Sequence, residues 1–184
     1  IGLVGSEMCI RDRTYSDKAA RIGLRVGDIQ NNFEEKYEAL KNRHLQILKD
    51  LNYTDFDITE EEKKWLEGVD YMRKFHLTDT EIEINRYLSE GKKVLAEGAQ
   101  GSMLDIDHGT YPFVSSSSTT SGGVCTGLGV APNKLDHIFG IFKAYSTRVG
   151  SGPFPVELFD ETGDTIRHIG NESVSYTHLT LPTT

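Results

Sequence analysis

Cysteine is almost absent from this chain of 184 residues, which has only Cys9 and Cys125. Two thiols provide neither the disulfide framework of a small secreted domain nor the four ligands of a cysteine-based zinc site. The scarcity therefore excludes both classes and favours a reducing compartment, the cytoplasm. Cys125 has no activating sequence context, so we predict a buried small residue rather than a nucleophile.

Positive charge is also in short supply. Lys and Arg total 20 against 28 Asp and Glu, which gives a net charge of −8. Such a balance argues against a nucleic acid or an anionic membrane as the main partner. Any anionic ligand must therefore be met by local cations.

Long apolar runs are missing as well. The longest uncharged run, residues 109–133, has 25 residues, of which nine are Ser or Thr and five are Gly. This composition predicts a polar loop region rather than a membrane span. With 37% hydrophobic and 26% charged residues, the chain has the composition of a soluble globular domain.

Three stretches in the region 31–90 have helical periodicity. Apolar residues recur every three or four positions from Phe33 to Leu51. Thr59 with Glu62, and Thr78 with Glu81, match the capping box that starts a helix. We therefore predict three helices, with the acidic run 60–62 complementing a helix dipole on a solvated face.

The pattern changes after Gly91. Residues 93–97 form a short apolar run that leads into the loop 98–101, as expected of a buried strand. Residues 135–145 resemble a helix, and residues 146–149 a further strand. This alternation predicts an α/β fold with part of a mostly parallel β-sheet and flanking helices.

The region 94–156 is rich in Gly, Ser and Thr and contains the candidate ligand groups. Such a backbone suits the close approach of a phosphate-bearing ligand. Gln100 lies in the loop after the predicted strand. A buried amide there requires hydrogen bonds, either to a ligand or to the backbone. Asp105, Asp107 and His108 are possible metal ligands, but their position before Gly109 favours a turn.

The two ends of the chain do not continue these patterns. Residues 1–13 and 173–184 show neither helical nor strand periodicity, and we interpret both as adapter-like, non-native segments. Frayed termini are the alternative. On our interpretation the authentic sequence comprises residues 14–172 and is a fragment of a longer protein.

Four stretches together resemble one known family. They are YSDKAAR (15–21), VLAEGAQGSMLDIDHGTYPFV (94–114), TTSGGVCTGLGVAP (119–132) and KAYSTRVGSGPFPVELFDETG (143–163). They closely resemble adenylosuccinate synthetases, ligases of purine and AMP biosynthesis, over essentially all of residues 14–172. The resemblance implies an incomplete P-loop NTPase-like ligase fold in a cytoplasmic homodimer.

The resemblance also implies a reaction. Members of the family join IMP and L-aspartate at the expense of GTP, with Mg²⁺, to give adenylosuccinate. They first phosphorylate the 6-oxygen of IMP, and the aspartate amine then displaces phosphate. Catalysis of this kind is mostly positioning and charge stabilisation.

Individual residues match the family's site positions. Gln100 matches a glutamine that binds IMP, and Ser115 stands where the family usually has a threonine that contacts the IMP phosphate. Arg21 matches an arginine that reaches into the partner subunit's IMP site, and Lys18 is the signature lysine, for which we infer a catalytic role or, alternatively, a salt bridge beside Asp17. Val149 and Gly150 fall at the ribose-contacting stretch.

Other family elements are not in the sequence. The Gly-rich segment GDEGKGK, which carries the general base and much of the GTP and magnesium binding, is missing. We therefore expect no metal ligands in this fragment and no ligase activity from it. The alternatives are a non-catalytic nucleotide-binding or dimerisation module and, more remotely, a metal-dependent hydrolase built on Asp105, Asp107 and His108.

Overall fold

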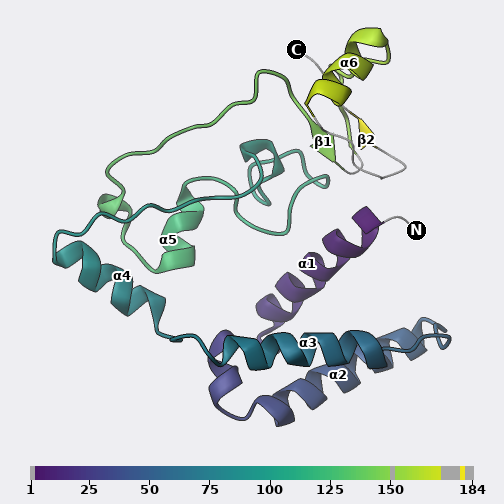
Figure 1. Cartoon of the computed structure of the whole chain (residues 1–184), viewed down its shortest axis with the longest axis vertical. Helices are drawn as coiled ribbons and strands as arrows, with labels where there is room; N and C mark the ends of the chain where they lie inside the picture. The colour runs from purple at the N-terminus through teal and green to yellow at the C-terminus, as the bar shows by residue number, and fades with distance from the viewer. Residues whose placement is uncertain (1–2, 150–151, 171–178, 181–184) are drawn as a thin grey trace.

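The computed structural model describes residues 3–149, 152–170 and 179–180, which are mostly helical (Figure 1). The α-helices are α1 (Leu3–Ala20), α2 (Phe33–Asp50), α3 (Thr59–Met72), α4 (Thr80–Ser89), α5 (Gly122–Leu128) and α6 (Glu161–Ile169). The 3₁₀ turns are η1 (Val26–Gln30), η2 (Ser102–Leu104) and η3 (Pro132–Lys134), and the strands are β1 (Arg148–Val149) and β2 (Leu179–Thr180). Within this part of the chain, no helix combines the length and the apolar character needed to cross a membrane.

Helices α2 and α3 lie side by side and, together with η1, contribute the buried members of a hydrophobic cluster (Figure 1). Its buried members are Ile29, Phe33 and Val69, with Leu66 and Leu77 among the side chains packed against them. Burial of this apolar face stabilises both helices, because an isolated helix of this length is marginal in water. The three helices predicted between residues 31 and 90 are confirmed as α2, α3 and α4.

The predicted capping boxes are wrong. Thr59 is the first residue of α3, and both its amide and its hydroxyl donate to Asp57 Oδ1, at 2.9 and 2.6 Å. Glu62, the other half of the predicted box, accepts hydrogen bonds from the Tyr37 hydroxyl at 2.6 Å and Lys41 Nζ at 2.7 Å on α2. Its carboxylate therefore joins two helices instead of capping one, and it does not lie on a purely solvated face.

The second predicted box does not coincide with the start of its helix. Helix α4 begins at Thr80, after Asp79, and no side chain caps its first turn. The helix itself forms as predicted, so the amphipathic pattern located it more reliably than the capping motif did.

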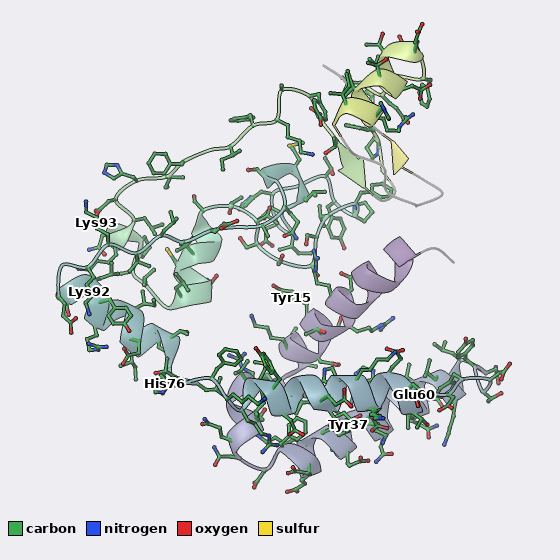
Figure 2. The ribbon with its side chains drawn as sticks, viewed as in Figure 1. Tyr15, Tyr37, Glu60, His76, Lys92 and Lys93 are labelled. Atoms are coloured by element: carbon green, nitrogen blue, oxygen red, sulfur yellow. The ribbon has the colours of Figure 1, made fainter. Side chains whose placement is uncertain are left out.

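The predicted mostly parallel sheet is not found in the described residues. Residues 93–97 form neither helix nor strand and pair with no other described segment, and Leu95 is 87% exposed. Figure 2 shows Lys92 and Lys93 where the chain leaves α4 and this segment begins. A strand requires a hydrogen-bonded neighbour, and the described chain supplies none here.

The predicted helix over 135–145 is also wrong. These residues are irregular, and Ile141 and Phe142 are 95% and 94% exposed. An apolar pattern produces a helix only when a surface is available to bury it. Of the strand predicted over 146–149, β1 alone forms, and it pairs antiparallel with β2, Arg148 opposite Thr180 and Val149 opposite Leu179.

Helix α1 includes residues that we predicted to be non-helical. From residue 11 onward its side chains are exposed, except that of Asp17, which is half-buried. The Asp17 carboxylate Oδ2 lies 2.7 Å from His44 Nε2 of α2. Because the described part of this helix buries almost nothing, it has no apolar stripe from which to predict it. The origin of residues 1–13 and 173–184 remains a prediction.

Candidate functional site

The most tightly organised polar region is the stretch 101–120, which we call the Asp105 loop. Asp105 is 0% exposed, although it is an acidic residue at a turn. Its Oδ1 accepts hydrogen bonds from the amides of Asp107 at 3.0 Å and His108 at 3.1 Å. The predicted turn is therefore confirmed, and a buried carboxylate is its organising group.

The second carboxylate oxygen of Asp105 binds a distant part of the same loop. Oδ2 accepts from the Ser118 hydroxyl at 3.0 Å and from the amides of Thr119 and Thr120 at 2.7 and 3.3 Å. Five donors from two segments thus converge on one side chain. The turn was predictable from the sequence, but this second set of donors was not.

The pKa of Asp105 reflects two opposing effects. Burial disfavours the charged carboxylate and raises the pKa, but the hydrogen bonds from Asp107, Thr119, His108 and Ser118 favour the charge more strongly. The pKa therefore lies well below the usual value of 3.8. Asp105 is ionised at neutral pH, and N–H and O–H dipoles rather than a cation stabilise its charge.

Backbone hydrogen bonds complete the Asp105 loop. The amide of Ser115 donates to the Leu104 carbonyl at 2.7 Å, and that of Ile106 donates to Ser117 at 3.3 Å. The Thr119 hydroxyl donates to the Gly101 carbonyl at 2.7 Å. Residues 101–106 and residues 115–119, the two arms of the loop, are therefore joined on both sides of Asp105.

Gln100 lies immediately before this loop in an unusual conformation. Its φ is +63°, in the left-handed region that residues other than glycine seldom adopt. The side chain is exposed, not buried as its position after the predicted strand suggested. With the amide oriented so that its oxygen faces a donor, Oε1 accepts from Arg11 Nη1 of α1 at 2.8 Å, so Gln100 is presented toward a cation.

Ser115, Ser116 and Ser117 follow one another on the loop, and we call their side chains the hydroxyl row. Ser115 is half-buried, and its Oγ lies 3.3 Å from Ser117 Oγ. Between them, the Ser116 hydroxyl oxygen is buried and has no hydrogen-bond partner among the described residues. A buried hydroxyl without a partner costs free energy, so this row has donor capacity for a ligand.

The ribose-contacting stretch predicted from the resemblance lies near this row. Arg148 Nη2 donates to the Phe113 carbonyl at 3.2 Å, and the Gly152 backbone lies against both Arg148 and Phe113. Val149 is in β1, next to Arg148. Gly150 lies outside the described residues. Arg148 was not among the contacts predicted from the sequence.

Lys18 and Arg21 are in a different part of the molecule, at the end of α1 that contacts α2. Lys18 Nζ lies 5.5 Å from the ring centroid of Tyr15, a residue labelled on α1 in Figure 2. Asp17 pairs with His44 and not with Lys18, so the salt-bridge alternative for Lys18 is wrong. Arg21, just after α1, has a φ of +62° and is exposed. Gln100 and Ser115 therefore belong to one loop system, the Asp105 loop together with the residue before it. Lys18 and Arg21 are not part of it.

The described residues do not supply a metal centre. In residues 3–149, 152–170 and 179–180, no three His, Cys, Asp or Glu side chains gather as ligands. Both carboxylate oxygens of Asp105 face N–H or O–H donors, which a metal ion would have to replace. A hydrolase built on Asp105, Asp107 and His108 is therefore not supported, and these residues do not fit a magnesium site. Cys125, on α5, is half-buried rather than buried.

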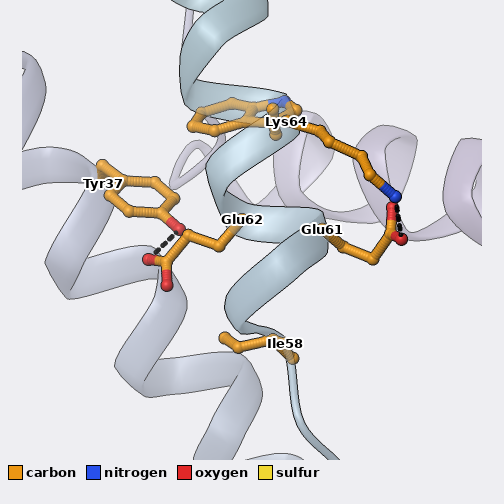
Figure 3. A pocket seen from close by; sticks show the side chains of 6 residues that line it. Tyr37, Ile58, Glu61, Glu62 and Lys64 are labelled. Carbon is orange, nitrogen blue, oxygen red and sulfur yellow. Dashed lines mark hydrogen bonds and ion pairs between the residues drawn. The ribbon is translucent and has the colours of Figure 1, made fainter.

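A hollow of about 520 Å³ lies on the helical pair, away from these residues (Figure 3). Tyr37, Ile58 and Trp65 provide its apolar surface. Figure 3 shows Glu62 bound to the Tyr37 hydroxyl and Glu61 paired with Lys64, so both carboxylates at its edge already have partners. None of the predicted site residues lines this hollow.

Comparison with known proteins gives one consistent result. A sequence model of the family described as adenylosuccinate synthetase matches residues 10–179. The chain is 63% identical to the adenylosuccinate synthetase of Bacteroides thetaiotaomicron over 164 residues, which cover 89% of this chain and 38% of that protein. It is 58% identical to that of Porphyromonas gingivalis over 164 residues, which cover 89% of this chain and 39% of that protein.

A solved structure agrees with the sequence comparisons. The fully ligated adenylosuccinate synthetase of Plasmodium falciparum superposes with a TM-score of 0.78 at 39% sequence identity. The superposition covers 92% of this chain and 40% of that one. The chain thus spans about two fifths of the length of the relatives it matches.

Proposed function

Because the chain belongs to the adenylosuccinate synthetase family, we propose that it carries part of the IMP-binding site of an enzyme that ligates IMP and L-aspartate with GTP. The product is adenylosuccinate, and the reaction runs through an IMP phosphorylated at its 6-oxygen. This intermediate is chemically reasonable because phosphate is a far better leaving group than a carbonyl oxygen. The whole enzyme would be a cytoplasmic homodimer.

One observation carries the proposal. Gln100, in its left-handed conformation, and the hydroxyl row that begins at Ser115 belong to one loop system fixed around Asp105. Gln100 offers an amide suited to the edge of a purine base, and Ser115 offers a hydroxyl suited to a phosphate oxygen. A nucleotide has these two recognition elements at its opposite ends.

Arg21 and Lys18 act elsewhere in this proposal. Arg21 is exposed and lies on the helical part of the chain, which suits a cation offered to the IMP phosphate of the partner subunit. Lys18 is assigned a catalytic role, and Val149 and Gly150 contact the ribose. Dimerisation would thereby add positive charge to that of Arg148, which lies near the hydroxyl row.

The remaining family elements are proposed for other segments of the whole enzyme. These are the magnesium ligands and the GTP site, for which this chain offers no GDEGKGK-like segment. We further propose that residues 93–97 and 146–149 join a mostly parallel sheet when those segments are present. The exposed apolar side chains of Val94 and Leu95 support this, because sheet formation would bury such surface.

Ligand titration of the purified 184-residue chain tests the proposal. We expect IMP to shift the NMR amide signals of the Asp105 loop, and we expect the chain alone to form no adenylosuccinate. Gln100→Ala and Ser115→Ala should each weaken IMP binding about tenfold, the effect of losing one good hydrogen bond. Gln46→Ala on α2 and Ser89→Ala on α4, both at exposed positions, are the matched controls. Equal binding by all five proteins would reject the assigned contacts.

A further inference from the structure

The Asp105 carboxylate is costly to bury and therefore calls for an explanation. Its side chain is fully buried, and no Lys, Arg or His pairs with it among the described residues. An unpaired ion in such a place is tolerated only when several hydrogen bonds stabilise it. Asp105 has five such donors, and all come from the loop that carries Ser115.

The donors fall on either side of the hydroxyl row. Asp107 and His108 precede it in the sequence, and Ser118, Thr119 and Thr120 follow it. The segment that contains Ser115 is therefore held at both ends by a single carboxylate. The bond from the Ser115 amide to Leu104, next to Asp105, fixes the middle.

The same arrangement connects the hydroxyl row to Gln100. The Thr119 amide donates to Asp105, while the Thr119 hydroxyl donates to Gly101, the neighbour of Gln100. Asp105 and Thr119 thus tie the backbone next to Gln100 to the part of the loop that carries Ser115.

We propose that Asp105 is a positioning residue, which holds the phosphate-binding hydroxyl of Ser115 at the correct distance from Gln100 so that one IMP molecule contacts both. This inference rests on the proposed function and adds a residue to it. Asp105 itself touches no ligand, because both of its oxygens are occupied by loop donors.

An amide cannot replace the carboxylate here. Asparagine has the same shape, but one of its two terminal groups is an NH₂ donor. In either orientation this donor faces two or three other donors, so one arm of the loop loses its acceptor. Asp105→Asn therefore changes the charge and hydrogen bonding of the loop with minimal change in volume.

The test compares IMP with inosine, which lacks the phosphate, on the full 184-residue chain. Asp105→Asn should raise the Kd for IMP at least tenfold and leave the Kd for inosine within about twofold, since Gln100 still meets the base. Loss of binding to both ligands by the same factor would indicate a merely structural role and overturn the proposal. Asp136→Asn, an exposed aspartate, is the matched control and should leave both constants unchanged.

Hydrogen exchange provides a second readout on the same samples. In Asp105→Asn the amides of Asp107, His108, Thr119 and Thr120 should exchange at least tenfold faster, while those of α2 and α3 keep their rates. If Asp105→Asn fails to fold, Ser118→Ala removes one of the five donors and should give a smaller shift in the same direction. If the loop amides of Asp105→Asn exchange faster but its Kd for IMP is unchanged, the positioning role is wrong and the proposed IMP site is unaffected.

The two hypotheses fail in different ways. If the wild-type chain binds neither IMP nor inosine while its loop amides are protected, the proposed IMP site is wrong and the positioning role falls with it. If the wild-type chain binds IMP and Asp105→Asn binds it equally well, only the positioning role is wrong.

Discussion

Replacing Phe33 with alanine should strongly destabilise the helical part of the chain. Phe33 is 5% exposed and lies in the buried cluster with Ile29 and Val69. Its ring stacks on Tyr37 and on Trp65, both at 5.8 Å between centroids. The substitution therefore removes a buried ring together with two aromatic contacts.

The magnitude follows from comparable core truncations. A buried phenylalanine replaced by alanine costs about 3–5 kcal/mol, since the apolar area is lost and a cavity remains. The upper half of that range is expected, because the stacked pairs add to the loss from burial. The cluster has few buried members, so its neighbours have little other apolar surface with which to fill the space.

Urea unfolding followed by the circular dichroism of the helices measures this loss. Phe33→Leu retains most of the volume but not the stacking, and should cost about 1 kcal/mol. Phe142→Ala is the control, because that ring is 94% exposed and its loss should change the free energy of unfolding by less than about 0.5 kcal/mol. Equal losses in Phe33→Ala and Phe142→Ala would refute the assignment of the core.

Three further predictions concern pH and the loop backbone. Burial and the hydrogen bond to a carboxylate raise the pKa of Tyr37 to about 12, above its usual 10.0. Between those values the unfolded chain loses the proton first, so stability should fall as the pH rises, and Tyr37→Phe should reduce the fall in urea titrations. The pKa of Asp105 is lowered from 3.8, so its stabilising contribution is present above that pH and lost as the pH falls below it. Thermal melts of Asp105→Asn should accordingly show a weaker dependence on acid pH than the wild type. Gly109→Ala places a methyl group against the carbonyl oxygens of Met103 and Asp105, and should weaken IMP binding more than tenfold in calorimetry. Gly127→Ala, with open space around it, should bind IMP normally and would contradict this reasoning if it did not.

The sequence predicted the helices α2, α3 and α4 because each has an apolar stripe that burial can use. It did not predict α1, whose described side chains are almost all exposed. The first capping box was wrong because the Thr59 hydroxyl donates to Asp57 and Glu62 bonds to α2, and the second because α4 begins at Thr80 with Asp79 before it. Such choices depend on neighbours that are adjacent in space rather than in sequence.

The strand predicted over 93–97 did not form, for a related reason. A strand is defined by the partner to which it hydrogen-bonds, and residues 93–97 have no such partner in the described chain. The helix predicted over 135–145 lacks a surface on which to pack, as the exposure of Ile141 shows. An apolar pattern records that a segment is suited to burial, but only the assembled chain determines where it is buried.

Sequence motifs alone pointed to the family, and the comparisons confirm that membership. The same motifs selected Gln100 and Ser115 as candidate IMP contacts. The turn at Asp105 was also predictable, because an aspartate commonly binds amides two and three residues ahead. Only the tertiary structure determined that its other oxygen binds residues 13 to 15 positions further along the chain. No local pattern encodes that contact, since it depends on the folding of one loop arm against the other around a buried charge.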